Sequence, residues 1–555
     1  MTNQIQQQPD EHHSVDRATT RPVVSGTGGV ISSGHPLVSM AGMRMLLLGG
    51  NAFDAAAAAG FAAAVIEPTA SYSLCAECVA IIHDAKGDQT LVLSGQGPAP
   101  ALATIAAFAE KGFPRIPTGP GPNAHLSFTV PGAVGAYLTL LESFGTRTIV
   151  EVLAPALENA EEGFPMYEYM HRMLSNRETR SQFALYPPGG EAVFYPAGRA
   201  PRVGERFRQP ALAATLQELA AAGAQGGGDR LAGIRAVRER FYRGDIADTI
   251  GAFSEKWGGL LRAADLAEYR AQFEPPLTTT FAGHEILGQS AWTQAPVVMQ
   301  ALGLLQTFDL KAMGHNSGRY VHTITEALKL AFADRERYYG DSPEVPLAEL
   351  LSPAYLRERA ALIRADRAMQ EAPPSGEVRH SRQRVAAPPR PSPAPNPTAA
   401  DANDGTTHIA CIDRDGNMIA LTPSGGVFRK SVFSLELGCT LSTRSEMFSL
   451  EEGHPNALAP GKRPRTTLIS YLICQRGRPI ATVGCPGGDD QGQANLQMIL
   501  NMLVFGMNPQ QAVEAPRFAT ETLIDSFWPH SYRPAVLSVE PGISEPVRDE
   551  LRALG

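Results

Sequence analysis

Apolar side chains recur at helical spacing in two consecutive runs within residues 35–68, and the letters GGN at 49–51 separate the two runs. Glycine commonly ends a helix and asparagine commonly caps the start of the next one, so this pattern predicts two successive helices. Residues 78–95 instead carry two short apolar runs of strand type around the turn residues at 86–88, which predicts a β-hairpin. Further helices are predicted at about 133–143, 148–163, 210–222, 230–241 and 316–338.

A proline-rich stretch interrupts this pattern late in the chain. Six of the ten residues 388–397 are proline, and the surrounding low-complexity segment, 373–404, predicts an exposed and partly extended linker. Apolar and polar residues alternate again over 407–422 on both sides of the letters DRDGN, the pattern of a second hairpin. A strand pair is predicted within 467–484 and a helix at about 489–505. We therefore expect α/β layers in which helices and antiparallel hairpins surround one sheet system.

The overall composition excludes two classes of partner. The formal net charge is −8, and an acidic chain offers no broad basic surface to neutralise phosphates, so we expect no nucleic-acid partner. No window approaches about 18 uninterrupted apolar residues, so we expect no membrane partner. Residues 1–20 are polar and lack the apolar core of a secretory signal, so we expect a cytoplasmic enzyme whose residues 1–26 form a flexible tail.

Six cysteines are scattered over the 555 residues, and their spacing forms no disulfide framework. One pair, in the letters CAEC at 75–78, has the spacing of a metal or redox site. No second pair of this kind and no nearby histidine completes such a site, so we interpret these cysteines as packing residues.

The junction between Gly405 and Thr406 is the first candidate for chemistry. If the linker is cut before Thr406, one residue carries both a hydroxyl nucleophile and a free α-amine, whose reference pKa of about 7.7–8.0 suits a general base near neutral pH. Gly405 has no side chain to hinder attack of the Thr406 hydroxyl on the preceding carbonyl, the first step of self-cleavage. The alternative is an ordinary threonine that starts a strand after a linker.

A second candidate is the pair Gly487-Gly488, which lies between a predicted strand and a predicted helix. Backbone amides at the start of a helix favour developing negative charge, and glycines allow a substrate to approach closely, so the pair would form an oxyanion hole. The alternative is a tight turn in which Asp489 caps the helix that follows.

Eight stretches spread along the chain form a combination that is specific to one protein family. They are GGNAFDAAAAAGFAAAVIEP, TVPGAVGAYL, LAEYRAQFEPPL, FDLKAMGHNSGRYVHTITEALKLAFADRERYYGD, TTHIACIDRDGN, GKRPRTTLI, CPGGDDQ and FGMNPQQAVEAPRF. With them the chain resembles the γ-glutamyltranspeptidase family of N-terminal nucleophile hydrolases over about residues 27–555. The resemblance implies an αββα four-layer sandwich and a precursor that cleaves itself before Thr406. The large subunit would be 27–405, including a linker at 373–405, and the small subunit 406–555 would carry the nucleophile.

The resemblance also assigns roles to residues that match the family's motifs. Thr406 matches the nucleophile, and Ser424 matches the hydroxyl residue that contacts it. Gly487 and Gly488 match the residues whose amides form the oxyanion hole. Thr466 and Thr467 stand where the family usually has a serine pair that holds the substrate carboxylate. The resemblance implies no cofactor and no metal.

Three positions depart from the family's substrate clamp. Gln96 stands where an arginine is expected to bind the α-carboxylate of a γ-glutamyl group. Met447 stands where an acid is expected to pair with the α-ammonium, with Glu446 beside it, and Gly426 replaces an expected asparagine. Each change removes a charge or a polar contact, and a buried carboxylate without a counter-charge is costly. We therefore expect γ-glutamyl compounds to be poor substrates.

Four cations near the motif-bearing segments are candidates for binding a differently shaped anionic substrate: Arg429, Lys430, Arg444 and Arg465. The alternative is solvated surface charge. Cephalosporin (glutaryl) acylases and oxamate amidohydrolases have an altered clamp and resemble the chain in architecture. Two histidines, His408 in the TTH motif and His322 in the long helix, are interpreted as structural residues.

We therefore expect a self-processing N-terminal threonine amidohydrolase that forms an acyl-enzyme on Thr406, which water or transfer to an amine resolves. The expected partners are a small-molecule amide with a glutaryl- or oxamate-like acyl group and the two subunits of the same precursor, while a higher oligomer stays open. One alternative is a true γ-glutamyltransferase or glutathione hydrolase. Another is a non-catalytic homologue, which the retained Thr406, Ser424 and Gly487-Gly488 disfavour.

Overall fold

The computed structural model of the chain describes residues 19–119, 121–185, 189–378, 405–426, 428, 430–527 and 530–555. Most of the predicted linker, most of the predicted tail and the candidate cation Arg429 therefore lie outside the described residues. Within the described part of the predicted tail, the Thr20 hydroxyl donates a hydrogen bond to the carboxylate of Glu514 at 2.8 Å.

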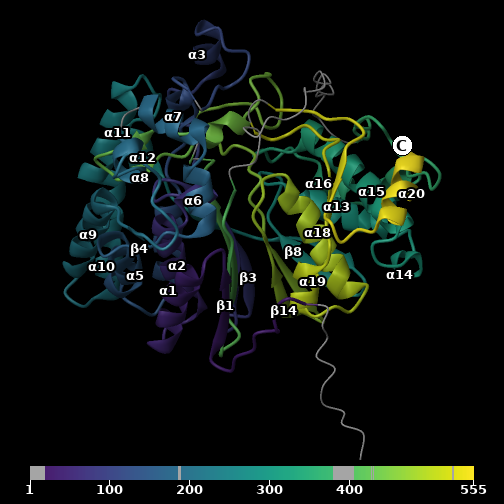
Figure 1. Ribbon diagram of the computed structural model, residues 1–555, viewed down its shortest axis with the longest axis horizontal. Helices are drawn as coiled ribbons and strands as arrows, with labels where there is room; N and C mark the ends of the chain where they lie inside the picture. The colour runs from purple at the N-terminus through teal and green to yellow at the C-terminus, as the bar shows by residue number, and fades with distance from the viewer. Residues whose placement is uncertain are drawn as a thin grey trace, which may run out of the picture.

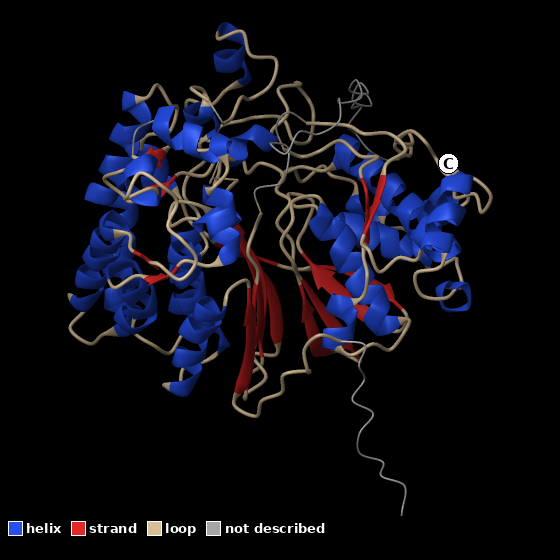
Figure 2. Ribbon diagram, in the orientation of Figure 1, coloured by secondary structure: helices blue, strands red, loops and turns tan. Residues whose placement is uncertain are grey.

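A six-stranded sheet of antiparallel pairs lies at the centre of the molecule (Figure 2). In order across the sheet its strands are β1 (Gly29–Ser33), β9 (Ile409–Asp413), β10 (Met418–Ser424), β2 (Glu77–Asp84), β3 (Gln89–Gly95) and β6 (Gln272–Glu274). The two predicted hairpins are confirmed as β2 with β3 and β9 with β10. The β9–β10 hairpin pairs with β1 on one side and β2 on the other, so segments from both sides of the linker share one sheet.

A second, four-stranded sheet faces the first. Its strands, in order, are β14 (Arg478–Val483), β13 (Tyr471–Gln475), β8 (His284–Gly288) and β7 (Leu277–Phe281). The strand pair predicted within 467–484 is confirmed as β13 and β14. The expectation of one sheet system is wrong, because the apolar alternation that identifies a strand does not identify the strand with which it pairs.

Helices cover the outer face of each sheet (Figure 1). A small apolar cluster fills the space between the sheets, with Val79 and Ala420 on one side and Leu468 and Leu472 on the other. On the six-stranded side lie α1 (Pro36–Leu47), α2 (Ala52–Ile66), α4 (Ala133–Phe144), α5 (Ile149–Glu161), α9 (Pro210–Ala224), α10 (Arg230–Arg243) and α11 (Asp245–Lys256). On the four-stranded side lie α13 (Ala295–Leu305), α15 (Gly318–Tyr338), α18 (Asp490–Leu503), α19 (Pro509–Glu514) and α20 (Glu545–Leu554).

The helices predicted from apolar spacing are confirmed as α1, α2, α4, α5, α9, α10, α15 and α18, with bounds that differ by a few residues. The mixed α/β class is therefore confirmed, with antiparallel sheets. In the part of the chain that the structure describes, no helix combines the length and the apolar character needed to cross a bilayer.

Helix α2 is buried along its whole length. Its alanines and its glycine allow close packing, since a Cβ at Gly60 would lie 2.5 Å from the ring of Tyr137. Asn51 caps the helix as predicted, in a reciprocal capping box with Asp54. The helix ends at Ile66, so that Glu67 follows directly and lies beside Thr407, just before β9.

Asp54 also holds the connection between α4 and α5. Its buried carboxylate accepts hydrogen bonds from the backbone N–H groups of Thr146 and Arg147 and from the Thr146 hydroxyl, at 2.7–3.1 Å. We expect Asp54→Ala to lower the free energy of unfolding by about 3 kcal/mol, because the hydrogen bonds of three donors to one buried carboxylate are lost together. Urea denaturation measures this loss.

The matched control is Asp84→Ala, at the exposed turn of the β2–β3 hairpin. There the carboxylate also accepts hydrogen bonds from backbone N–H groups, those of Lys86 and Gly87. Water replaces the lost acceptor at this turn, so the expected change is below about 1 kcal/mol. Equal losses for the two variants would contradict the role assigned to Asp54.

Candidate active site

Thr406 lies three residues before the start of β9 and is 6% exposed. Its hydroxyl donates a hydrogen bond to the carbonyl oxygen of Gly405 at 2.8 Å. Gly405 has a φ of 91°, a conformation that favours glycine, and a Cβ there would lie 3.3 Å from Cα of Ala70 and 3.4 Å from the hydroxyl of Tyr169. The candidate nucleophile is therefore next to the peptide group that it would attack.

The neighbouring Thr407 is held by a buried acid. Its hydroxyl donates to Oε2 of Glu67 at 3.0 Å, and its backbone N–H donates to the carbonyl of Pro423 at 3.4 Å. Burial raises the pKa of Glu67 to about 7, and the hydrogen bond from Thr407 opposes this shift. The sequence analysis did not identify Glu67, although an acid that directly follows the apolar run of α2 was a visible signal.

Ser424 is the last residue of β10 and pairs across the sheet with Glu77. Its hydroxyl donates to the carbonyl oxygen of Ser71 at 3.3 Å, and the N–H of Gly425 donates to the same oxygen at 2.8 Å. The bond between Thr407 and Pro423 places Ser424 close to the start of β9. Its predicted contact with the nucleophile stays a prediction.

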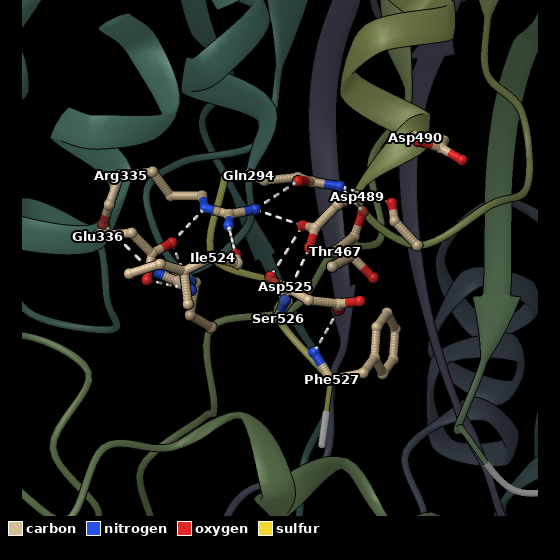
Figure 3. Close-up of polar contacts among 12 residues, drawn as sticks. Gln294, Arg335, Glu336, Thr467, Asp489, Asp490, Ile524, Asp525, Ser526 and Phe527 are labelled. Atoms are coloured by element: carbon tan, nitrogen blue, oxygen red, sulfur yellow. Dashed lines mark hydrogen bonds and ion pairs between the residues drawn. The ribbon is translucent and has the colours of Figure 1, made fainter. Parts of the chain in front are cut away.

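Gly487 and Gly488 form the turn between β14 and α18, with φ values of 124° and 55° that favour glycine. The N–H of Asp490 donates to the carbonyl of Gly487 at 2.9 Å, which holds the turn against the helix. Asp489 is the N-cap residue of α18, as the alternative of a tight turn expected, but its side chain makes no capping hydrogen bond. Its carboxylate instead accepts hydrogen bonds from Arg335 and from Ser526 (Figure 3).

Thr466 and Thr467 run beside this glycine turn. The side-chain amide of Gln294 donates to the carbonyl oxygens of both Thr467 and Gly488, each at 2.9 Å. The Thr467 hydroxyl is buried and has no hydrogen-bond partner among the described residues, whereas the Thr466 hydroxyl accepts from the N–H of Leu468 at 3.3 Å. The side chain of Gln294 thus links the proposed carboxylate-binding pair to the proposed oxyanion turn.

Two ion pairs within the chain lie beside the clamp positions Met447 and Gly426. Arg444 is 1% exposed and its guanidinium pairs with Glu77, so the interpretation of Arg444 as surface charge is wrong. Arg444 also donates to the sulfur of Met447 at 3.7 Å. Gln96 is 1% exposed, and its Oε1 has no hydrogen-bond partner among the described residues.

The second clamp pair is Lys430 with Glu446, at 3.5 Å. The Lys430 ammonium also lies 4.7 Å from the ring centroid of Phe527, within the range of a cation–π contact. Gly426 approaches this pair closely, because a Cβ there would lie 3.2 Å from Oε1 of Glu446. These contacts bring residues 426, 430, 446 and 527 together at one wall of the site.

Arg465 is not part of that wall. It is 6% exposed and pairs with Glu336 at 3.1 Å, so its interpretation as surface charge is also wrong. Two acids near Asp489 have raised pKa values. Burial and the charge of Asp489 raise the pKa of Asp525 to about 7 and that of Asp490 to about 6.

The sequence analysis missed Gln294, Arg335, Asp525 and Phe527. Two of them, Gln294 and Arg335, lie outside the glycine and threonine motifs, and no local pattern connects them with these motifs. The segment of Asp525 and Phe527 follows the last motif that carries the family resemblance.

The remaining histidine and cysteine interpretations agree with the structure. The ring of His408 is hydrogen-bonded to the Thr422 hydroxyl at 2.9 Å, and burial lowers its pKa to about 4. The ring of His322 is hydrogen-bonded to the carbonyl of Arg364 at 2.6 Å. All six cysteines are free, and the sulfurs of Cys75 and Cys439 lie 3.6 Å apart. The described residues contain no group of three or more His, Cys, Asp or Glu side chains that could hold a metal ion.

The raised pKa of Glu67 predicts a pH dependence of stability. An acid with a pKa of about 7 in the folded state and 4.5 in the unfolded state binds more protons when folded. The free energy of unfolding therefore falls as pH rises through this window, by about 3 kcal/mol from this group. Glu67→Gln cannot ionise at this position. As pH rises from 4.5 to 8, we therefore expect its free energy of unfolding to increase by about that amount relative to the wild type. Chemical denaturation across this range measures the difference.

The control is Glu110→Gln, at an exposed glutamate. This variant makes the same chemical change at the protein surface, so its result corrects for any effect of the Glu-to-Gln change itself. After that correction, a difference between Glu67→Gln and the wild type that does not vary with pH would contradict the raised pKa of Glu67.

The chain matches a protein family over nearly its full length. The family model described as Gamma-glutamyltranspeptidase matches residues 38–555. The chain is 30% identical over 527 residues to a protein named Glutathione hydrolase proenzyme from Pseudomonas sp. (strain A14), with 92% of this chain and 85% of that protein covered. It is 31% identical over 541 residues to one named Acylase ACY 1 proenzyme from Pseudomonas sp. (strain V22), with 96% and 87% covered.

Solved structures agree with these matches. The structure of LmbA2991HD has a TM-score of 0.88 and 38% identity, with 97% of this chain and 92% of that chain covered. The cephalosporin acylase from Bacillus halodurans has a TM-score of 0.80 and 28% identity, with 100% and 92% covered. The chain therefore belongs to the γ-glutamyltranspeptidase family and is an enzyme of its hydrolase and transferase type.

Proposed function

We propose that the protein is a self-processing N-terminal threonine amidohydrolase that cleaves itself between Gly405 and Thr406. The observation that carries this proposal is the hydrogen bond of 2.8 Å from the Thr406 hydroxyl to the Gly405 carbonyl. The two facing sheets with helices outside then correspond to the αββα sandwich of this class of hydrolase. The relatives named proenzymes support processing of the chain.

The self-cleavage uses groups that are already in place. The Thr406 oxygen adds to the Gly405 carbonyl carbon, the peptide C–N bond breaks, and an ester joins the two residues. Water then hydrolyses this ester, which gives Gly405 a carboxylate and leaves Thr406 with a free α-amine. The products are a large subunit, which ends at Gly405 and includes the tail 1–26, and a small subunit, 406–555; they stay together because both contribute strands to both sheets.

In turnover the same hydroxyl attacks the amide of the substrate. The α-amine of Thr406 accepts the hydroxyl proton and returns it to the leaving amine, and the acyl group remains as an ester on Thr406. The N–H groups of Gly487 and Gly488 stabilise the oxyanion, and water then releases the acid. Ser424 supports the hydroxyl, and the Thr466-Thr467 pair holds the distal end of the acyl group.

We further propose that the acyl group lacks the α-amino group of a γ-glutamyl substrate and is glutaryl- or oxamate-like. The charges at the clamp support this proposal, because Arg444 is paired with Glu77 and Lys430 with Glu446. Gln96 stands in place of the expected arginine and Met447 in place of the expected acid, so these two positions carry no charge to hold a zwitterion. Similarity to acylases supports this choice, while similarity to glutathione hydrolases supports γ-glutamyl turnover as the second candidate.

The first test concerns processing. We expect purified wild-type protein to separate on a denaturing gel into two pieces, the smaller of which begins Thr-Thr-His. Thr406→Ala should remain a folded, inactive, full-length chain, because alanine has no hydroxyl for either reaction, and Thr406→Ser should still process. Thr249→Ala, at a partly exposed threonine of α11, is the control and should process like the wild type. Turnover by unprocessed Thr406→Ala would place the nucleophile elsewhere.

The second test concerns the acyl group. Each charge-assisted hydrogen bond lost at the clamp is worth about 1.5–3 kcal/mol, so two losses amount to about 3–6 kcal/mol, or about two to four decades in kcat/KM. We expect processed enzyme to turn over the p-nitroanilide of glutaric acid better than the γ-glutamyl p-nitroanilide. A tenfold preference for the γ-glutamyl compound would instead favour ordinary γ-glutamyl activity.

A further inference from the structure

The side chain of Gln294 connects the two halves of the proposed site. Both N–H groups of its amide are used, one on the carbonyl of Thr467 and one on the carbonyl of Gly488, each at 2.9 Å. Its backbone N–H donates to the carbonyl of Thr466 at 3.1 Å. Gln294 is 1% exposed, so water does not compete for these acceptors. The amide therefore sets how the threonine pair lies relative to the glycine turn.

The orientation of this amide depends on Arg335. The two ends of a glutamine amide have nearly the same shape, and a flipped amide would direct its oxygen at two carbonyl oxygens. Oε1 of Gln294 accepts a hydrogen bond from Nη1 of Arg335 at 3.1 Å. A guanidinium only donates, so it can face the oxygen end of the amide and not the N–H end. Arg335 thereby excludes the flipped amide.

The guanidinium of Arg335 also binds Asp489, which follows the glycine turn, and the segment at Ile524. Nη1 also pairs with Asp489, which follows Gly488, and Nη2 donates to the carbonyl of Ile524 at 2.8 Å (Figure 3). The carboxylate of Asp489 in turn accepts from the N–H of Ser526 at 2.7 Å and from its hydroxyl at 2.8 Å. Phe527, which lies under Lys430, comes next in the chain.

Arg335 stays charged in this buried position. It is fully buried, and burial would lower its pKa, but the charges of Asp489 and Glu336 outweigh burial and raise the pKa. Glu336 accepts from Nε of Arg335 at 2.7 Å, and the ring of Phe332 lies 4.6 Å below the guanidinium carbon. The guanidinium is therefore held on every edge, in a fixed position relative to the turn.

We propose that Arg335 is a positioning residue of the reaction, which fixes the C-terminal side of the glycine turn, the Gly488 carbonyl and Asp489, through Gln294 and its own ion pair with Asp489. The carbonyl of Gly487 accepts a hydrogen bond from the N–H of Asp490, and the carbonyl of Gly488 accepts from Gln294 and from the N–H of Gln491. The N–H of Gly488 shares a peptide group with the Gly487 carbonyl, so fixing the carbonyls on both sides of Gly488 aims this N–H before substrate arrives, which is the condition for stabilising an oxyanion. This inference rests on the proposed function in that the N–H of Gly488 acts on the oxyanion.

The decisive variant is Gln294→Glu. It keeps the size of the side chain and the oxygen that faces Arg335, so folding is preserved by an added ion pair, but it places an oxygen against the carbonyls of Thr467 and Gly488. A displaced oxyanion turn weakens the transition state more than the bound substrate. We expect kcat to fall about 10- to 100-fold while KM changes less than about threefold. Arg335→Lys should act in the same direction, because one ammonium cannot hold Gln294, Asp489 and Ile524 together.

The control is Arg337→Gln on the same helix. Arg337 pairs at 2.6 Å with Glu377, whose side chain is 79% exposed, and this pair is separate from the network around Arg335. The control should keep kcat and KM within about twofold of the wild type. The assay uses whichever of the glutaryl and γ-glutamyl p-nitroanilides the processed wild type hydrolyses faster, so the outcome does not depend on which acyl group the enzyme prefers.

Hydrogen exchange gives a readout that needs no substrate. In processed Gln294→Glu, the peptide that spans residues 483–491 should exchange about tenfold faster, while peptides from β9 and β10 keep wild-type rates. If the wild type hydrolyses neither anilide, the proposed function is contradicted. The hydrogen-exchange result alone would then decide whether Gln294 orders the turn. Unchanged kcat with unchanged exchange, or a rise in KM alone, would overturn the role of Arg335.

Discussion

Backbone pairing on both edges of the β9–β10 hairpin is the constraint on which the site depends. β9 is aligned with β1 from Gly29 opposite Asp413 to Ser33 opposite Ile409, and β10 is aligned with β2 up to Ser424 opposite Glu77. A slip of one residue would turn every side chain of these strands to the other face of the sheet. The register therefore fixes Thr406 just before β9 and Ser424 at the end of β10. A cut before Thr406 leaves all of these pairs intact.

Buried charge determines the shape of the walls around that point. Arg335, Arg444 and Arg465 are all nearly inaccessible, and each has an acid as partner. A buried cation without a partner is strongly destabilising, so each arginine requires its acid nearby and fixes the segment that carries it. The cost is that these cations are no longer available to a substrate. Charges that look free along the sequence are therefore structural in the folded chain.

Local signals in the sequence predicted most of the elements and the positions of the candidate nucleophile and glycine turn. The cap at Asn51 and the two hairpins depend on neighbouring residues, and the structure has them where they were predicted. The pairing of β13 with β8 depends on contacts between segments far apart in the chain, which no local pattern encodes. For the same reason the sequence did not predict that the carboxylate of Asp489, the N-cap residue of α18, binds Arg335 and makes no capping hydrogen bond.

The Arg335 network also bears on how the substrate preference of this site can change. The guanidinium that orients Gln294 also holds the carbonyl of Ile524, and Asp489 holds Ser526, so the oxyanion turn and the wall that carries Phe527 share one anchor. Replacements at the wall that disturb this anchor therefore act on kcat as well as on substrate binding. Replacements at positions 96, 426 and 447 change the polarity of the clamp without touching the guanidinium. This separation would allow a family member to exchange charges at the clamp while the proposed oxyanion turn keeps its geometry.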